Sequence, residues 1–306
     1  MPRNRRIRRK SDTRYHYTRG WTSFRLFGRR TGRIGAGINV LKSKKTITAG
    51  IDAGSRETKA VILGDNLVLA RSSARGEGRT PDAAREAWDE VLSLAGLTAG
   101  EVLHVTATGV GRAGVDFAGS KVTGLTAAAS AGIFLYPGVE MIIEVGAEET
   151  TVLLTDGRGK VLDSAASDKC ASGSGAFLDA MARALSMTLR EFGEAGLRAK
   201  GGVEMNSQCA VFAESEVVGM IHKNIPLEEI SRAVHSSIAV RVAAMAKRLG
   251  RRDRASFFGG MALNPTFRVC LGESLAGVEL LVPEAPAHAG ALGAALIARA
   301  HLGEGA

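Results

Sequence analysis

The sequence predicts an α/β fold of two similar domains that face one cleft. Two observations lead to this prediction. First, a buried strand, a short glycine-containing turn and a returning strand occur twice, at a spacing of about 90 residues. Second, strands dominate the early part of each copy, and the later part of the chain is helical, with apolar residues spaced by three and four. An internal repeat of this kind indicates one supersecondary unit used twice.

The first copy of the repeat is expected to have the order β-β-β-α-β-α. Its opening strand is apolar enough to be buried, and its first helix has a proline in the first turn, where no backbone N–H is needed. The expected strands are Thr46 to Asp52, Thr58 to Leu63, Asn66 to Ser73 and Val102 to Thr108, and the expected helices are Pro81 to Ala95 and Ala127 to Phe134.

The second copy begins after Pro137 with the same succession of strands and then becomes helical. The expected strands are Glu140 to Val145, Thr150 to Asp156, Lys160 to Ala165 and Ser256 to Phe258, and the expected helices are Gly175 to Ser186, Val211 to His222, Leu227 to Leu249 and Gly290 to Ala300. We therefore expect one domain at residues 46–137 and a second at residues 138–306, with a helical insertion in the second.

Residues 1–45 form a basic leader. They hold fifteen of the 40 Lys and Arg residues and a single acid, Asp12, so the rest of the chain has 25 bases against 30 acids. The net charge of +9 is therefore no general argument for nucleic acid, although a basic arm with aromatic residues could touch RNA or an acidic partner. Arg-rich leaders also resemble transit peptides. We expect a disordered segment or an extension from an upstream start codon.

The composition favours a cytoplasmic protein. Three cysteines without a Cys-x-x-Cys pair argue against a disulfide framework and fit a reducing compartment. The longest apolar stretches, such as Ala291 to Ile297, are far shorter than the roughly 20 residues that cross a bilayer, so no membrane span is expected. The histidines show no spacing that suits a zinc site or a catalytic triad.

Each glycine turn of the repeat follows a carboxylate at a strand end. In the first turn, Asp52 precedes Gly54 and Ser55, and Lys59 lies on the returning strand. Backbone N–H groups of such a turn can reach phosphate oxygens, and the aspartate can hold Mg²⁺ through water. An ordinary hairpin turn explains this motif equally well when it is taken alone. Its repetition at residues 144–149 favours a phosphate site.

Two adjacent glycines, Gly259 and Gly260, follow the expected strand at residues 256–258. A flat ring can lie against backbone that carries no side chains, so adenine would fit there. A Gly-Gly pair is also common in loops. The interpretation gains weight only because two phosphate turns precede it in the chain.

Cys170 and Cys209 each come just before an expected helix. A helix N-terminus favours a thiolate and the negative charge of a cluster held by sulfur. A lone cysteine is more often a small buried apolar residue, and we interpret Cys270 in that way. Two thiolates can complete a four-thiolate cluster only if a two-fold dimer brings two such pairs together.

Residues 168–178 read DKCASGSGAFL and residues 209–217 read CAVFAESEV. The two segments resemble the DKCAAGTGxFL and CxVFAESEV motifs of the ATPase family that includes 2-hydroxyacyl-CoA dehydratase activators and benzoyl-CoA reductase ATPase subunits. The resemblance runs from Thr46 to about Leu302 and includes the closing segment Pro283 to Ala295. It implies duplicated actin-like (ribonuclease H-like) domains facing a nucleotide cleft, as in the acetate and sugar kinase, Hsp70 and actin superfamily.

The resemblance also implies cofactors and site residues. ATP or ADP with Mg²⁺ is expected in the cleft, and Cys170 and Cys209 are the expected metal ligands of one [4Fe-4S] cluster shared between two subunits. The expected catalytic residues are Asp52, Glu144 and Glu148. The expected nucleotide-binding residues are Gly54, Ser55, Lys59, Gly146, Glu214, Gly259, Gly260 and Asn264.

The chain departs from the dehydratase activators near both turns. Activators usually carry Asp-Ile-Gly-Gly-Gln-Asp where residues 144–149 here read EVGAEE, which resembles the benzoyl-CoA reductase delta-type subunit. Arg56 replaces a small hydroxyl residue after Ser55, and Gly124 and Ala127 also differ from the activators. These departures bear on nucleotide turnover more than on nucleotide binding.

The sequence therefore predicts an ATP-hydrolysing electron-transfer subunit that passes electrons from ferredoxin to a CoA-thioester enzyme. Benzoyl-CoA reductase is the favoured partner enzyme, and the second subunit of the dimer is either another copy or a related ATPase subunit. Three alternatives remain open: an activator of a 2-hydroxyacyl-CoA dehydratase, a sugar or acyl-acid kinase of the same fold, and a nucleotide-regulated assembly factor without a redox role.

Overall fold

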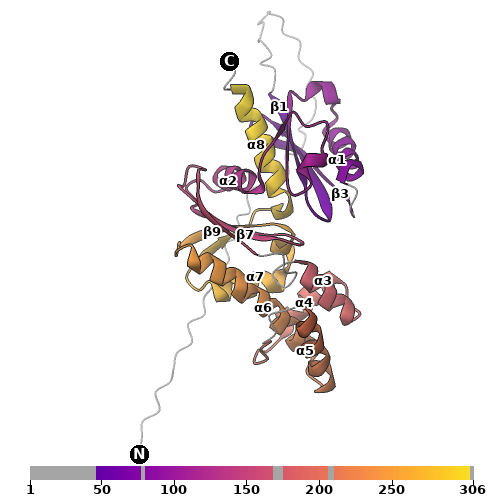
Figure 1. The fold of residues 1–306 in the computed structure, drawn as a ribbon, viewed down its shortest axis with the longest axis vertical. Coiled ribbons are helices and arrows are strands. Elements are labelled where there is room, and N and C mark those ends of the chain that lie inside the picture. Colours follow the sequence, from indigo (N-terminus) through magenta and orange to yellow (C-terminus); the bar gives the residue numbers. More distant parts are fainter. Residues whose placement is uncertain (1–45, 77–79, 168–174, 206–209, 304–306) are drawn as a thin grey trace, which may run out of the picture. The chain divides into compact units, whose positions relative to one another are not determined.

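Two five-stranded sheets with the same strand order organise the chain (Figure 1). The computed structural model describes residues 46–76, 80–167, 175–205 and 210–303. The basic leader and the segments that contain Cys170 and Cys209 lie outside these ranges. Residues 44–306 form one compact unit.

The first sheet has the order β3-β2-β1-β4-β5. The strand β1 runs antiparallel to β2 and parallel to β4, and β2 runs antiparallel to β3. Its strands are β1 (Ile47–Ala53), β2 (Glu57–Gly64), β3 (Leu67–Arg75), β4 (His104–Thr108) and β5 (Ser120–Lys121).

The second sheet repeats this order as β8-β7-β6-β9-β10, with the same strand directions. Its strands are β6 (Met141–Val145), β7 (Thr150–Thr155), β8 (Val161–Ala166), β9 (Arg254–Phe258) and β10 (Glu279–Leu281).

The two copies match even at an irregularity of the ladder. The register shifts after Ile62 in the first sheet and after Leu154 in the second, and each position lies ten residues after its strand-end carboxylate, Asp52 or Glu144. The α/β fold of two similar halves that the sequence predicts is confirmed.

Eight α-helices connect and cover the sheets within the described ranges. They are α1 (Thr80–Ala95), α2 (Gly124–Leu135), α3 (Gly175–Ala184), α4 (Leu189–Ala195), α5 (Ala210–His222), α6 (Leu227–Arg248), α7 (Pro265–Ser274) and α8 (Ala289–Gly303). The expectation missed the short elements α4, β5 and β10, and it noted only a helical pattern around Cys270 where α7 lies. No helix of this part of the chain has the length and apolarity needed to cross a membrane.

The closing helix of each copy covers the sheet of the other copy. The last helix, α8, packs on β1, β2 and β4 of the first sheet, whereas α2 packs on β6, β7 and β8 (Figure 1). The two helices also contact each other. The domain boundary at residue 137 stays a prediction, and the structure adds that the chain returns to the first sheet at its end.

Glycines allow this close packing. A side chain at Gly50 in β1 would overlap the backbone of α8, and one at Gly293 in α8 would overlap the carbonyl of Ala127 in α2. The second sheet reverses the arrangement, because there the glycine is on the helix: Gly132 of α2 faces Ile142 of β6. A helix can lie closer to a strand or to another helix where one of the two lacks a Cβ. This close packing fixes the positions of the strand ends in the two sheets.

Candidate functional site

The two glycine turns of the repeat have the same hydrogen bond. The N–H of Gly54 donates to the carbonyl of Glu57 at 3.1 Å, and the N–H of Gly146 donates to the carbonyl of Glu149 at 2.8 Å. Each turn joins the end of a central strand, β1 or β6, to its antiparallel neighbour. The repetition of the turns predicted from the sequence is therefore present in three dimensions.

The strand-end carboxylates Asp52 and Glu144 lie near enough for their charges to interact. Burial and, to a smaller extent, the negative charges of Asp52 and Glu149 raise the pKa of Glu144 to about 8, and the charge of Lys59 opposes them. Burial also raises the pKa of Asp52 from its ordinary value, again opposed by Lys59. The strand ends of the two copies thus bring two carboxyl groups and one ammonium group together.

Lys59 and Ser55 complete the set of candidate site residues around the first glycine turn. Lys59 pairs with Asp52 across β1 and β2, and its Nζ lies 3.3 Å from the carbonyl oxygen of Glu57 and 3.6 Å from the Glu57 carboxylate. Ser55 is partly buried within the turn. An ammonium at the open side of a glycine turn suits an anionic ligand.

Gly109 and Gly259 occupy equivalent places in the two halves. Each follows the strand next to the central one, with φ of +86° and +88°. A Cβ at Gly109 would collide with the carbonyl of Ala53, and one at Gly259 with the carbonyl of Val145. Both residues are therefore restricted to glycine by conformation and by space. The sequence interpretation included Gly259 but missed Gly109.

Two glycines enclose the Asp52 carboxylate. A Cβ at Gly109 would lie 2.5 Å from Oδ1 of Asp52, and one at Gly290 would lie 2.9 Å from Oδ2. Gly290 is the second residue of α8, so the carboxylate faces the first turn of that helix. In the sequence, the only indication of Gly290 was its place in the closing segment of small residues, 283–295.

The Gly259-Gly260 pair directly follows β9, and Gly260 begins a short 3₁₀ helix, Gly260–Leu263. Gly260 is exposed, and nothing lies within 4 Å of the position where its Cβ would be. The N–H of Gly259 donates to the carbonyl of Pro286 at 3.0 Å. The open backbone at Gly260 is compatible with a flat ligand ring.

Asn264 is held by protein partners on both sides. Its Oδ1 accepts the N–H of Phe267 at 2.9 Å and so caps α7, and its Nδ2 donates to Nε2 of His235 at 3.0 Å. His235 in turn donates from Nδ1 to the carbonyl of Ser231 at 2.7 Å. These contacts fix the tautomer of His235 and show Asn264 in a capping role.

The buried His235 predicts a loss of stability in acid. Burial lowers the pKa of His235 to about 4. The unfolded chain takes up a proton below about pH 6.5 while the folded chain does not, so the free energy of unfolding falls as the pH drops from 6.5 toward 4, by about 3 kcal/mol in total.

Urea unfolding at pH 7 and pH 4.5 measures this effect. His235→Gln, which cannot titrate, is expected to lose less stability between the two pH values than the wild-type protein, whereas the exposed His222→Gln behaves as wild type. An identical loss in His235→Gln and wild type contradicts the assignment.

Glu148 and Glu214 are not among the charged groups that shift the pKa of Asp52 or Glu144. Glu148 is exposed in the second turn, and Glu214 is exposed on α5. Their predicted roles stay predictions. Cys170 and Cys209 lie outside the described residues, and within those residues no group of three or more His, Cys, Asp and Glu could hold a metal ion.

The helix α3, which follows the Cys170 segment, is tied to both turns. Its first two residues, Gly175 and Ala176, donate N–H groups to the carbonyls of Gly146 and Ala147 at 3.0 and 2.7 Å. Arg56 of the first turn bonds Asp179 of α3 at 2.8 Å. Arg56, which stands where the dehydratase activators have a small hydroxyl residue, therefore adds a contact from the first turn to this helix.

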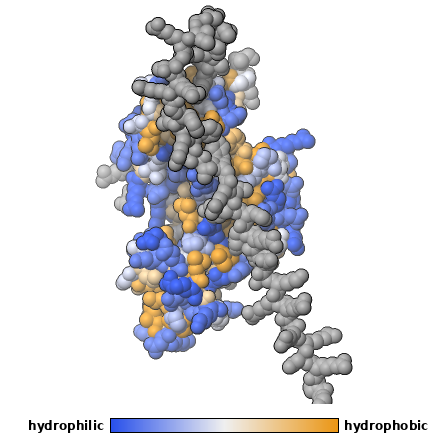
Figure 2. Space-filling model, turned by 180° about the vertical axis from the view of Figure 1, so that it is seen from behind, coloured by the Kyte–Doolittle hydropathy of each residue, from blue (hydrophilic) through white to orange (hydrophobic). Residues whose placement is uncertain are grey.

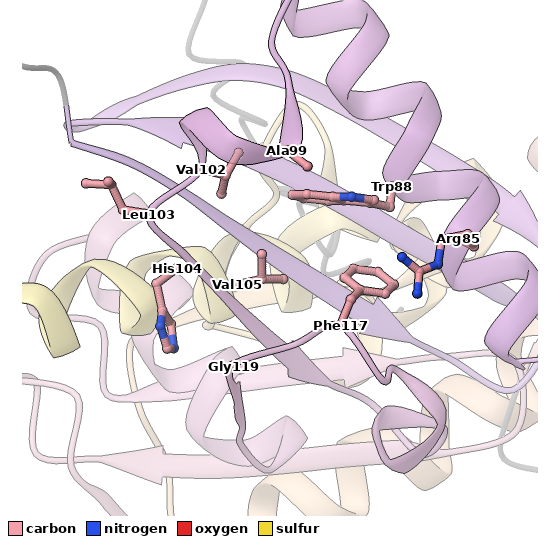
Figure 3. A pocket seen from close by; sticks show the side chains of 9 residues that line it. All are labelled: Arg85, Trp88, Ala99, Val102, Leu103, His104, Val105, Phe117 and Gly119. Atoms are coloured by element: carbon pink, nitrogen blue, oxygen red, sulfur yellow. The ribbon is translucent and has the colours of Figure 1, made fainter.

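A cavity of about 320 Å³ lies elsewhere, between α1 and β4 (Figure 3). Figure 3 shows the rings of Trp88 and Phe117 at its wall, with centroids 5.4 Å apart, and Arg85 beside Phe117. Arg85 also pairs with Asp116 at 2.8 Å. The cavity shares no lining residue with the two turns, so it is separate from the candidate site.

A duplicated sheet-and-turn unit that brings two strand-end carboxylates, a lysine and two glycine turns together defines a two-lobed nucleotide-binding protein. The sequence profile of the BadF/BadG/BcrA/BcrD ATPase family matches residues 49–298, and the chain belongs to this family. The family resemblance inferred from the sequence is confirmed.

Related proteins agree with this assignment. The chain is 33% identical over 253 residues to the 2-hydroxyisocaproyl-CoA dehydratase activator of Clostridioides difficile, covering 82% of this chain and 94% of the relative. It is 35% identical over 262 residues to the D subunit of benzoyl-CoA reductase from Thauera aromatica, covering 82% and 92%.

A solved structure confirms the actin-like fold. Component A of the (R)-2-hydroxyglutaryl-CoA dehydratase of Acidaminococcus fermentans superposes with a TM-score of 0.81 at 33% identity, covering 84% of this chain and 99% of that one.

Proposed function

We propose that this chain is an ATP-hydrolysing electron-transfer subunit that carries half of a dimer-bridging [4Fe-4S] cluster and passes electrons to a CoA-thioester enzyme. The observation that carries the proposal is the pair of interacting carboxyl groups, Asp52 and Glu144, at equivalent strand ends beside two glycine turns. Because the chain belongs to an ATPase family, the reaction proposed at this pair is ATP hydrolysis.

The site residues have complementary roles toward ATP. The turns that contain Gly54, Ser55 and Gly146 receive the phosphates, and the N–H groups of Gly54 and Gly146 hold these turns in shape through their bonds to Glu57 and Glu149. Lys59 neutralises phosphate charge, and the Gly259-Gly260 backbone receives adenine. The two partly buried carboxyl groups attract the cation that accompanies a triphosphate and orient water at the terminal phosphate.

Mg²⁺ fits this set of donors. It binds through one or two carboxylates together with waters and substrate phosphates, and Asp52 and Glu144 supply two carboxylates within the site. When bound, the ion would neutralise charge on the phosphate oxygens. A two-carboxylate site is also consistent with the lack of a larger ligand cluster in the described ranges.

The cluster is assigned to Cys170 and Cys209 from their sequence motifs. The helices that follow them, α3 and α5, contact each other, and α3 is tied to both turns. Nucleotide-dependent movement of the turns would therefore reach the helix behind Cys170. Because each chain supplies two thiolates, four thiolates require a dimer.

An exposed apolar surface supports such a dimer. Figure 2 shows hydrophobic residues on the part of the molecule where α5 lies in Figure 1, and α5 exposes Phe212, Val218 and Ile221. Phe212 alone has 68% of its surface exposed. A helix with several exposed apolar side chains is a typical interface element.

The electron donor proposed is ferredoxin, and the acceptor is benzoyl-CoA reductase. The EVGAEE turn at residues 144–149 and the similarity to the D subunit of the Thauera aromatica enzyme favour this acceptor. Similarity to the dehydratase activators of Clostridioides difficile and Acidaminococcus fermentans favours a second candidate, the activation of a 2-hydroxyacyl-CoA dehydratase.

Anaerobic purification with iron and sulfide analysis tests the proposal. We expect a brown protein with about four iron atoms per dimer, and Cys170→Ser and Cys209→Ser are each expected to lose the iron while still hydrolysing ATP. Cys270→Ala is the matched control, because this buried thiol, with a pKa raised by burial to about 11, packs in the core. A colourless protein that hydrolyses ATP after full iron reconstitution overturns the cluster assignment.

A further inference from the structure

Thr108, the last residue of β4, has a buried hydroxyl without a hydrogen-bond partner within the described ranges. As a residue, Thr108 is 1% exposed. Other buried hydroxyls of the two sheets do have partners: those of Thr48, Ser72, Thr106 and Thr155. A buried hydroxyl without a hydrogen bond is unfavourable, so this one calls for an explanation.

The strand register places Thr108 beside Asp52. In the first sheet Asp52 is paired with Lys59 on one side and with Thr108 on the other. Side chains of residues paired across a sheet project from the same face, so all three groups share one face. It is the face that α8 covers, where Gly290 lies against the Asp52 carboxylate. The unpartnered hydroxyl therefore belongs to the corner that holds the carboxylate.

The second half of the molecule lacks this hydroxyl. Phe258 is paired with Glu144 in the second sheet, as Thr108 is paired with Asp52 in the first, and Phe258 is fully buried among apolar side chains. The glycines that follow, Gly109 and Gly259, are equivalent in both halves. The fold thus accepts an apolar residue at this position, and its stability does not require the hydroxyl.

We propose that the Thr108 hydroxyl, together with the Asp52 carboxylate, holds the water molecule that attacks the terminal phosphate of ATP. This inference rests on the proposed ATPase function. The water oxygen forms a bond to the terminal phosphorus, the bond from that phosphorus to the bridging oxygen of ADP breaks, and a proton of the water passes to an oxygen of the departing phosphate. ADP and phosphate leave.

Thr108→Val tests the inference because it replaces the hydroxyl by a methyl group of similar size. We expect kcat for ATP hydrolysis to fall about 10- to 100-fold, with KM and the Kd for ADP unchanged, since orienting groups act on the chemical step. Thr108→Ser restores the hydroxyl and is expected to restore most of kcat. The thermal midpoint of Thr108→Val should equal or exceed that of the wild-type protein, which a merely structural role would not give.

Ser256→Ala is the matched control. Ser256 is the other buried hydroxyl without a partner in this part of the chain, but it is paired with Ile142, two residues before the end of β9. Its removal should leave kcat unchanged.

A folded Thr108→Val protein with the wild-type kcat overturns the inference alone. If that variant does not fold, equal kcat values for Thr108→Ser and Thr108→Ala overturn it. A wild-type protein that neither binds nor hydrolyses ATP overturns the proposed function and this inference together.

Discussion

Asp52→Asn is expected to reduce ATP hydrolysis by about 10²- to 10⁴-fold, the range for losing a positioned carboxylate that acts in the transition state. Asp52 lies at the end of β1 between Gly109 and Gly290, and its charge interacts with Glu144 and Lys59. An amide in the same place keeps the shape but supplies no negative charge to hold a cation or to orient the attacking water. Steady-state phosphate release under saturating ATP and Mg²⁺ measures the effect.

The same substitution is expected to stabilise the fold at neutral pH. Because burial raises the pKa of Asp52, the folded chain holds its proton at pH values where the unfolded chain has lost it. The free energy of unfolding of the wild-type protein therefore falls as the pH rises above about 4, and the variant lacks this fall. Urea unfolding at pH 7 should show a more stable variant.

Asp89→Asn is the control for Asp52→Asn, because Asp89 is exposed on α1 and lies away from both turns. It should change neither hydrolysis nor stability appreciably. Wild-type hydrolysis by Asp52→Asn would remove this carboxylate from the mechanism. Increased stability together with lost activity is typical of a residue kept for function.

The repeat could be predicted because its signal is local. A buried strand, a carboxylate at its end, a glycine turn and a returning strand fit within about 20 residues, and the pattern occurs twice. The short strands β5 and β10 and the seven-residue helix α4 were missed, because they are too short for apolar residues to show a period.

The site residues that the sequence did not indicate owe their position to distant parts of the chain. Gly290 matters because it lies against Asp52, and Thr108 because β4 pairs with β1. His235 reaches Asn264 only when α6 packs beside α7. Asn264 is a different case: an asparagine directly before a proline is a helix-start signal, and the N-cap seen here could have been predicted.

Gly293→Ala is expected to destabilise the protein by about 3 kcal/mol or more, which is large for a single methyl group. In an exposed helix the same change stabilises by about 1 kcal/mol, because glycine is a poor helix former. At Gly293 the new Cβ would overlap the carbonyl oxygen of Ala127 and lie 2.6 Å from its carbonyl carbon. Backbone atoms of α2 cannot move aside as a flexible side chain would, so the overlap outweighs the propensity.

Gly219→Ala is the matched control, since Gly219 lies within α5 and nothing is within 4 Å of its Cβ position. It should raise the free energy of urea unfolding, whereas Gly293→Ala should lower it. Because α2 and α8 each cover the sheet of the other copy, forcing them apart also separates Asp52 from Glu144. Gly293→Ala should therefore weaken ATP binding as well. A stabilised Gly293→Ala protein would show that the two helices do not cross this closely.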